Sequence, residues 1–125
     1  MSVRRDLDGL RLQTPGDPAV YMIDQGTKRH VADPQTYTAL FRDWNSIVQD
    51  ADTNEIDTGP EIAAGTALVQ GFGDAHVYLV DQGTKRWIES PATMDRYDFD
   101  WNKIFRVPMG AIQAMPDGPG IVWPE

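Results

Sequence analysis

Alternation of apolar and polar residues picks out the same short pattern twice along the chain. Residues 20–31 and residues 77–88 each contain two runs rich in β-branched and aromatic residues, joined by a Gln-Gly pair. Runs of this composition favour strands, and glycine supplies the positive φ that a two-residue connection needs. The pattern therefore predicts two β-hairpins, with turns at Gln25-Gly26 and Gln82-Gly83.

The similarity between the two halves continues outside the hairpins at a constant spacing of 57 residues, from Val20 to Val77. A repeat of this period is typical of two copies of one supersecondary unit. We expect repeat 1 at about 9–60 and repeat 2 at about 66–119. Matching positions include Gln13, Gly16 and Asp17 with Gln70, Gly73 and Asp74, and Asp43-Trp44-Asn45 with Asp100-Trp101-Asn102.

A helix start signal follows each hairpin. Asp33-Pro34 and Ser90-Pro91 place a capping side chain before a proline at the first helical position. They predict short helices over residues 34–41 and 91–97. Residues 120–123 predict a closing strand, which we expect to pair with a first strand at 9–13.

These elements predict a single domain over residues 1–125, of the α+β class and mainly antiparallel β. Its two tandem repeats would be related by pseudo-twofold symmetry, with two short helices flanking the sheet. A chain of 125 residues is too short for two independent cores, so the repeats should share one. The predicted core is Val20, Met22, Val31, Trp44, Ile47, Val77, Leu79, Ile88, Trp101 and Ile104.

Composition excludes several classes of function. The formal net charge is −8 and the chain has no cysteine, so a nucleic-acid partner is disfavoured and thiol catalysis, disulfides and thiolate zinc sites are excluded. No apolar run reaches the length that spans a bilayer, and none follows Met1 as a signal sequence would. We expect no membrane insertion, and either a cytoplasmic protein or a module of an exported one.

The motifs Val77-Tyr78-Leu79-Val80, Lys85-Arg86-Trp87-Ile88 and Asp100-Trp101 resemble a type of tandem repeat found in bacterial secreted and envelope-associated proteins. In those repeats a strand leads to a Val-Tyr-Leu hairpin, a Lys-Arg pair, a capped helix and a Gly-Trp or Asp-Trp turn. The resemblance covers nearly the whole chain. It implies a modular, surface-type role and no particular activity.

The aromatic pair of the second hairpin is the leading candidate for a binding site. The predicted register sets Tyr78 opposite Trp87, which would form a platform for a sugar ring with polar groups beside it. The alternative is that the pair packs under the helix as core. The candidate ligand-binding residues are Tyr78, Asp81, Gln82, Lys85 and Trp87, with Tyr21, Asp24, Gln25, Lys28 and His30 as the weaker site of the first hairpin.

The Lys-Arg pair in each hairpin has two interpretations. Lys28-Arg29 and Lys85-Arg86 could hold an anionic group, or they could form salt bridges with nearby aspartates. Neighbouring strand residues point to opposite faces, so such a dipeptide cannot act as one clamp.

Metal binding and catalysis find little support. Asp50, Asp52, Asn54 and Glu61 have EF-hand-like spacing, but Glu55 stands where the loop needs glycine. The chain has two histidines, His30 and His76, and no Gly-x-Ser-x-Gly or phosphate-loop motif. We therefore expect no metal, no cofactor and no enzymatic activity.

The expected function is a non-catalytic, lectin-like binding module for a small glycan, with two unequal sites. Trp87 is larger and flatter than His30, so the second site should be the stronger. An alternative is a protein-interaction or structural module of a larger bacterial assembly, in which a homo-oligomer is compatible with the same aromatic faces. A small hydrolase is a third hypothesis.

Overall fold

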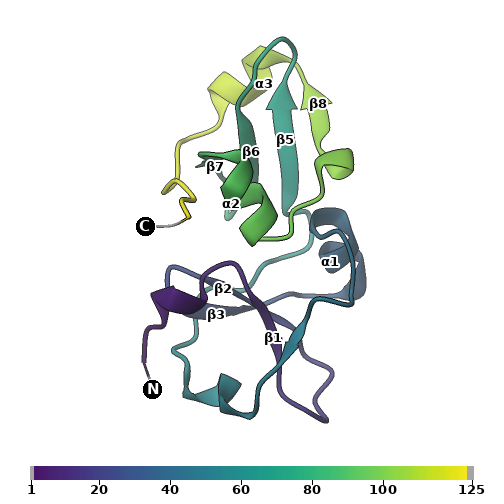
Figure 1. Cartoon of the computed structure of the whole chain (residues 1–125). Coiled ribbons are helices and arrows are strands. Elements are labelled where there is room, and N and C mark those ends of the chain that lie inside the picture. The colour runs from purple at the N-terminus through teal and green to yellow at the C-terminus, as the bar shows by residue number, and fades with distance from the viewer. Residues whose placement is uncertain (1, 124–125) are drawn as a thin grey trace.

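Two four-stranded sheets, one from each half of the chain, form the body of the structure (Figure 1). The computed structural model describes residues 2–123. The first sheet has the order β3-β2-β1-β4, from β1 (Arg11–Gln13), β2 (Tyr21–Asp24), β3 (Thr27–His30) and β4 (Val48–Gln49). The second has the order β7-β6-β5-β8, from β5 (Ala67–Gly71), β6 (Val77–Asp81), β7 (Thr84–Ile88) and β8 (Phe105–Val107).

Both sheets are mixed, which corrects the single, mainly antiparallel sheet expected from the sequence. The first three strands of each half pair antiparallel, whereas β4 and β8 run parallel to β1 and β5. Parallel neighbours need a crossover connection, and the helix after each hairpin provides it. The α+β class is confirmed, with short helices and more strand than helix.

The hairpins have the predicted register and turns. Tyr21 lies opposite His30, and Tyr78 lies opposite Trp87. Both turn residues have positive φ in each half, at 52° and 75° for Gln25-Gly26 and 53° and 77° for Gln82-Gly83. This is the type I′ geometry, whose twist suits the flanking strands.

Helices begin where the capping signals predict. The Asp33 side chain accepts a hydrogen bond from the Thr36 amide at the start of α1 (Pro34–Leu40), and Ser90 caps α2 (Pro91–Arg96) through Thr93 in the same way. A third helix, α3 (Met109–Ala114), was not predicted. Three 3₁₀ turns complete the elements: η1 (Arg5–Leu7), η2 (Ala51–Glu55) and η3 (Trp101–Lys103).

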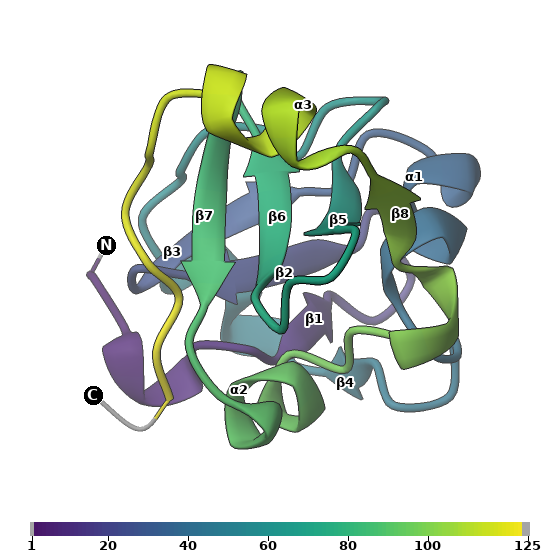
Figure 2. The same cartoon turned by 90° about the horizontal axis from the view of Figure 1, so that it is seen from above.

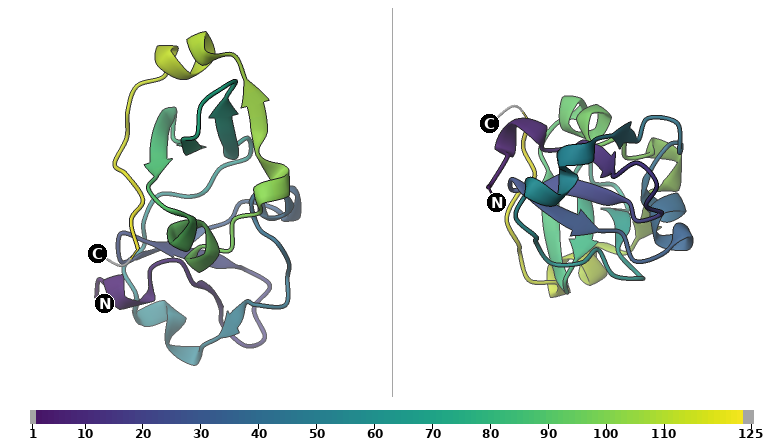
Figure 3. Two further views of the ribbon diagram at one scale, coloured as in Figure 1. Left: turned by 45° about the horizontal axis from the view of Figure 1, so that its top comes forward. Right: turned by 90° about the horizontal axis from the view of Figure 1, so that it is seen from below.

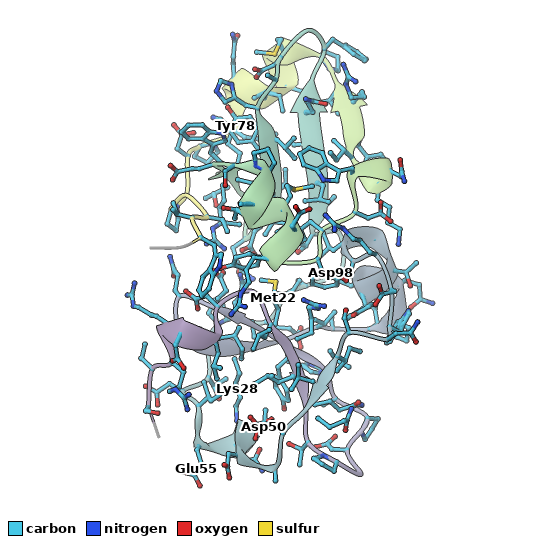
Figure 4. All side chains as sticks on the ribbon, viewed as in Figure 1. Met22, Lys28, Asp50, Glu55, Tyr78 and Asp98 are labelled. Atoms are coloured by element: carbon cyan, nitrogen blue, oxygen red, sulfur yellow. The ribbon has the colours of Figure 1, made fainter. Side chains whose placement is uncertain are left out.

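The inner faces of the two sheets share one core with the helices. Six predicted core residues are buried there, and Ile47 and Ile104 pack against it half-buried. In Figure 4, Met22 lies between the halves, whereas Lys28 points from the first sheet towards η2. The prediction is wrong for Trp44 and Trp101, which are 47% and 46% exposed.

Backbone contacts also join the halves. Phe41 and Phe99, which follow α1 and α2, form an antiparallel bridge. In place of the predicted strand at 120–123, the structure has a single bridge from Ile121 to Ile88. The prediction that this segment pairs with residues 9–13 is therefore wrong. Both edges of β1 are already occupied by β2 and β4. Within residues 2–123, no helix has the length and hydropathy to cross a bilayer.

Candidate functional site

Two of the predicted ligand contacts lie in the interior. Asp24 and Asp81, at the ends of β2 and β6, are 3% exposed and face two arginines. Arg29 Nη1 and Nη2 each donate to Asp81 at 2.7 Å, and Arg29 Nη1 also donates to Asp24 at 2.9 Å. Arg86 Nη1 donates to Asp24 at 2.6 Å and to Asp81 at 3.0 Å.

This Asp-Arg quartet (Asp24, Arg29, Asp81 and Arg86) is closed and electrically balanced. Each arginine also donates its Nε–H to a backbone carbonyl, of Pro60 or of Pro119. Burial raises the pKa of Asp81, but the ion pairs with Arg29 and Arg86 outweigh it and hold the pKa below its usual range. The aspartates therefore join the halves and do not offer oxygens to a ligand.

The two hairpin lysines point to the other face of each sheet, as strand alternation requires. Lys28 is buried, with Nζ 3.4 Å from the Thr53 carbonyl and above the Tyr21 ring. Lys85 Nζ donates to the Met115 carbonyl at 2.7 Å and pairs with Asp117. The salt-bridge interpretation is thus confirmed for the two arginines, which pair with Asp24 and Asp81, whereas the lysines contact backbone carbonyls and other partners.

The glutamines at the hairpin tips are exposed. Gln82 donates its side-chain amide to the Glu61 carbonyl at 2.8 Å, whereas the Gln25 side chain forms no hydrogen bond within residues 2–123. Behind the tips, the Asp-Arg quartet borders a small polar cavity of about 140 Å³.

Both predicted cross-strand pairs are in register, and in the first hairpin the Tyr21 and His30 rings lie 5.6 Å apart. In the second hairpin Trp87, which is 41% exposed, stands opposite half-buried Tyr78. The contact there runs through His76, which the sequence left without a role: its ring centre lies 6.3 Å from that of Tyr78 and 5.1 Å from that of Trp87. Trp87 is therefore partly accessible, with a histidine that extends its surface.

A pocket opens in each half beside the start of the helix. The first, of about 320 Å³, is lined by ten residues from Pro18 to Trp44; the second, of about 160 Å³, is lined by ten from Ala75 to Trp101. Every lining residue of the first has its counterpart 57 positions later in the second. The two pockets are thus formed by equivalent positions of the two halves. His30 of the first corresponds to Trp87 of the second, Tyr37 to Met94, and Trp44 to Trp101.

The pockets combine a tryptophan face with hydrogen-bond acceptors. Trp44 packs against the Tyr37 ring, with 4.0 Å between the ring centres and 31° between the planes, and its side chain stays 47% exposed. The Asp33 carboxylate lines the first pocket, and Glu89 lines the second. Hydrogen bonds from Thr36 hold the pKa of Asp33 below its usual range. Among the described residues that line them, neither pocket has a lysine or arginine.

Sequence reasoning missed Trp44 and Trp101 as site residues because both were assigned to the core. The signal was the repeat itself, since Asp-Trp-Asn recurs at the same place in both halves. A tryptophan kept at a turn after a helix is often only partly buried, because of its size.

A buried cation near the first pocket has a structural role. Arg11, 3% exposed, donates to the Gly9 carbonyl at 2.9 Å and pairs with Asp98 at 3.4 Å. Its repeat counterpart is Leu68, a core residue. Burial raises the pKa of Tyr37, although the neighbouring Arg11 guanidinium acts to lower it. The Tyr37 hydroxyl donates to the Asp43 carbonyl at 2.7 Å.

No cluster of metal-binding side chains occurs within residues 2–123. The acidic stretch with EF-hand-like spacing forms the turn η2, where the Asp50 carboxylate accepts from the Asp52 amide. Comparison with protein-family models, with curated proteins and with solved structures found no match.

Proposed function

We propose that the chain is a non-catalytic binding module for neutral carbohydrate, with two unequal sites related by a pseudo-twofold axis. The sites are the Trp44 pocket and the Trp101 pocket, described above. Of the ring-bearing residues that the sequence assigned to the two sites, His30 and Trp87 line these pockets, whereas Tyr21 and Tyr78 do not. Asp24, Asp81, Lys28 and Lys85 do not belong to the proposed sites, because they are engaged elsewhere.

One observation carries the proposal: a tryptophan that is nearly half exposed stands at equivalent pockets in both halves. Large aromatic side chains gain most from burial, so keeping two of them in contact with water at matched positions favours a binding role. The flat face of an indole suits the C–H face of a sugar ring.

The polar groups at the pockets favour an uncharged ligand. Carboxylates of Asp33 and Glu89 can accept from sugar hydroxyls, whereas an acidic sugar would meet like charge in a chain of net charge −8. The His30 imidazole lies 3.1 Å from the Glu61 carboxylate, at the rim of the first pocket.

Pocket size supports a ranking opposite to the one expected from Trp87 alone. The first pocket, at about 320 Å³, falls at the lower end of the range for small-molecule sites, near 300 Å³, and the second is about half as large. Trp87 itself occupies space that His30 leaves open. The Trp44 pocket is therefore proposed as the stronger site.

The test is a glycan array with the full chain, followed by calorimetric titration of any glycan that binds. Trp44→Ala should weaken binding several-fold and Trp101→Ala less, since loss of an aromatic contact costs on the order of 1 kcal/mol. Phe72→Ala removes another exposed aromatic side chain outside both pockets and should change nothing. An array with no binder, or equal affinity in all three variants, would contradict the proposal.

A protein-interaction module is the second candidate function. Phe105 is 59% exposed and lies outside both tryptophan pockets. In this proposal the chain acts as one module of a larger bacterial assembly, in line with the repeat motifs that its hairpins resemble.

A further inference from the structure

Helix α1 lies next to β8 (Figure 2). A groove runs along this side of α1, between the helix, the residues around β8 and the segment that leads into β5. It consists of two hollows of about 690 and 440 Å³, which share Gln35, Ala39 and Phe105 as walls. The Phe105 ring borders both hollows and is 59% exposed. This α1 groove is larger than either tryptophan pocket.

The corresponding surface of α2 is filled by the chain itself. The Arg96 guanidinium lies over the Trp123 ring, 4.0 Å from its centre. Arg96 Nε also donates to the Asp8 carbonyl at 2.6 Å, and the Trp123 amide donates to Thr93 Oγ1 at 3.1 Å. An indole and a guanidinium thus cover this side of α2, where the two ends of the described chain run close together (Figure 3).

The repeat explains why the α1 side is open. Ala39 stands 57 positions before Arg96. Ile62 bridges to Val31, and Ile121 bridges to Ile88, so the two isoleucines are equivalent. Ala64 and Trp123 each follow their isoleucine by two residues and are therefore equivalent as well. Alanine therefore occupies both positions that hold the guanidinium and the indole in the other half. The α1 groove therefore opens where the other half of the chain has an arginine and a tryptophan.

We propose that the α1 groove binds a peptide segment of a partner protein that presents an aromatic side chain beside an arginine or lysine. The second half of the chain shows this pair seated on the equivalent helix face. Charge agrees with this choice, since the chain has net charge −8 and Asp33 lines the groove. The one lysine among the described lining residues, Lys103, donates its Nζ to the Phe41 carbonyl at 2.7 Å.

The probe for a test is the dipeptide acetyl-Arg-Trp-amide, titrated into the ¹⁵N-labelled full chain. Saturable amide shifts are expected at Ala39, Ala64 and Ala67, with acetyl-Glu-Trp-amide binding several-fold more weakly. No saturable shift at these positions, or equal binding of the two dipeptides, would overturn the proposal. Shifts that vary with protein concentration and accompany a dimer in sedimentation would identify a second copy as the occupant and overturn it as well.

The decisive variant is Ala39→Arg combined with Ala64→Trp, which rebuilds in the first half the pair that covers α2. It should fold and abolish dipeptide binding. Should this variant fail to fold, Phe105→Ala tests the same groove from its exposed wall and should weaken binding several-fold, with Phe72→Ala as the matched control. Trp44→Ala should leave dipeptide binding unchanged, so glycan binding and peptide binding can fail independently.

Discussion

Arg29 of the first hairpin donates two hydrogen bonds of 2.7 Å to Asp81 of the second, 52 residues further along the chain. In turn, Arg86 of the second hairpin donates two hydrogen bonds to Asp24 of the first. Each hairpin thus supplies one aspartate and one arginine to a contact that joins the two halves. The stability of the whole chain should depend on this exchange more than on any surface ion pair.

We expect Asp81→Asn to lower the free energy of unfolding by about 3–5 kcal/mol, because it leaves two buried guanidinium groups to share one carboxylate. Denaturant unfolding measures the loss. Asp117→Asn is the control, since Asp117 pairs with Lys85 but is 81% exposed, and such pairs contribute about 0–1 kcal/mol. Similar losses in the two variants would show that the Asp-Arg quartet does not hold the halves together.

Acid should weaken the fold. The pKa values of Asp33, Asp74 and Asp81 are lower in the folded chain than their ordinary values. Their ionised forms therefore contribute stability that is fully present above the unfolded pKa, near 3.9, and is lost as the pH falls through the folded values. Unfolding measured from about pH 5 to about pH 2 should show a steady decline.

Asp33→Asn isolates one part of this acid response. Asparagine caps a helix about as well as aspartate, through the same side-chain oxygen, but it does not titrate in acid. Stability near neutral pH should stay close to that of the parent chain, while the decline towards low pH becomes shallower. Parallel curves for the two proteins would contradict the role assigned to this carboxylate.

Ser90→Ala should cost about 0.5–2 kcal/mol of unfolding free energy, since it removes the hydrogen bond that caps α2. Thr38→Ala, at an exposed position within α1, is the control. It should be neutral or slightly stabilising, because alanine is the better helix former. Thermal unfolding of both variants gives the comparison.

Two glycines mark a close approach that both halves need. A Cβ at Gly59 would overlap Thr27, and a Cβ at Gly118 would overlap Thr84. We expect Gly59→Ala and Gly118→Ala to destabilise the chain to a similar degree. Gly110→Ala, in α3 with open space around it, should stabilise it by about 0.5–1 kcal/mol. A tolerated alanine at both close positions would show that the threonines can move aside.

Phe99 and Trp101 are two positions apart, but they differ in exposure and should therefore differ in the stability lost on truncation to alanine. Phe99→Ala should cost about 3–5 kcal/mol, because the Phe99 ring is fully buried. Trp101→Ala should cost much less, since the Trp101 side chain is 46% exposed. Unfolding curves as steeply shifted for Trp101→Ala as for Phe99→Ala would remove this tryptophan from the proposed site.

Local signals predicted the hairpins and helix starts correctly because turn and cap chemistry depends on adjacent residues. Gln-Gly turns and Asp-Pro or Ser-Pro caps need no knowledge of the rest of the chain. The parallel pairing of β4 with β1 and of β8 with β5 could not be predicted, because strands this short have no residue pattern that indicates which strand they pair with. Helix α3 follows Pro108, which is its N-cap residue, and contains Gly110; neither residue favours a helix interior.

The candidate site was harder to predict than the fold. Asp24 and Asp81 lie at exposed-looking hairpin ends in the sequence, and only the meeting of distant segments buries them against Arg86 and Arg29. The tryptophan pockets likewise form where hairpin, helix and turn converge. Hydrophobicity alone assigned Trp44 and Trp101 to the interior, although the polar neighbours Asp43 and Asn45 place the first of them in a turn.

The reciprocal contact between the hairpins also bears on ancestry. In a twofold dimer of identical chains, each contact occurs twice, so an aspartate that meets an arginine of the other subunit does so in both directions. A chain of about half this length, carrying one aspartate and one arginine at these positions, would therefore be complementary to a second copy of itself. Gene duplication and fusion would then convert a self-associating peptide into one chain without creating a new interface. Later divergence, such as alanine at 39 and 64 against arginine and tryptophan at 96 and 123, would give the two sides separate tasks.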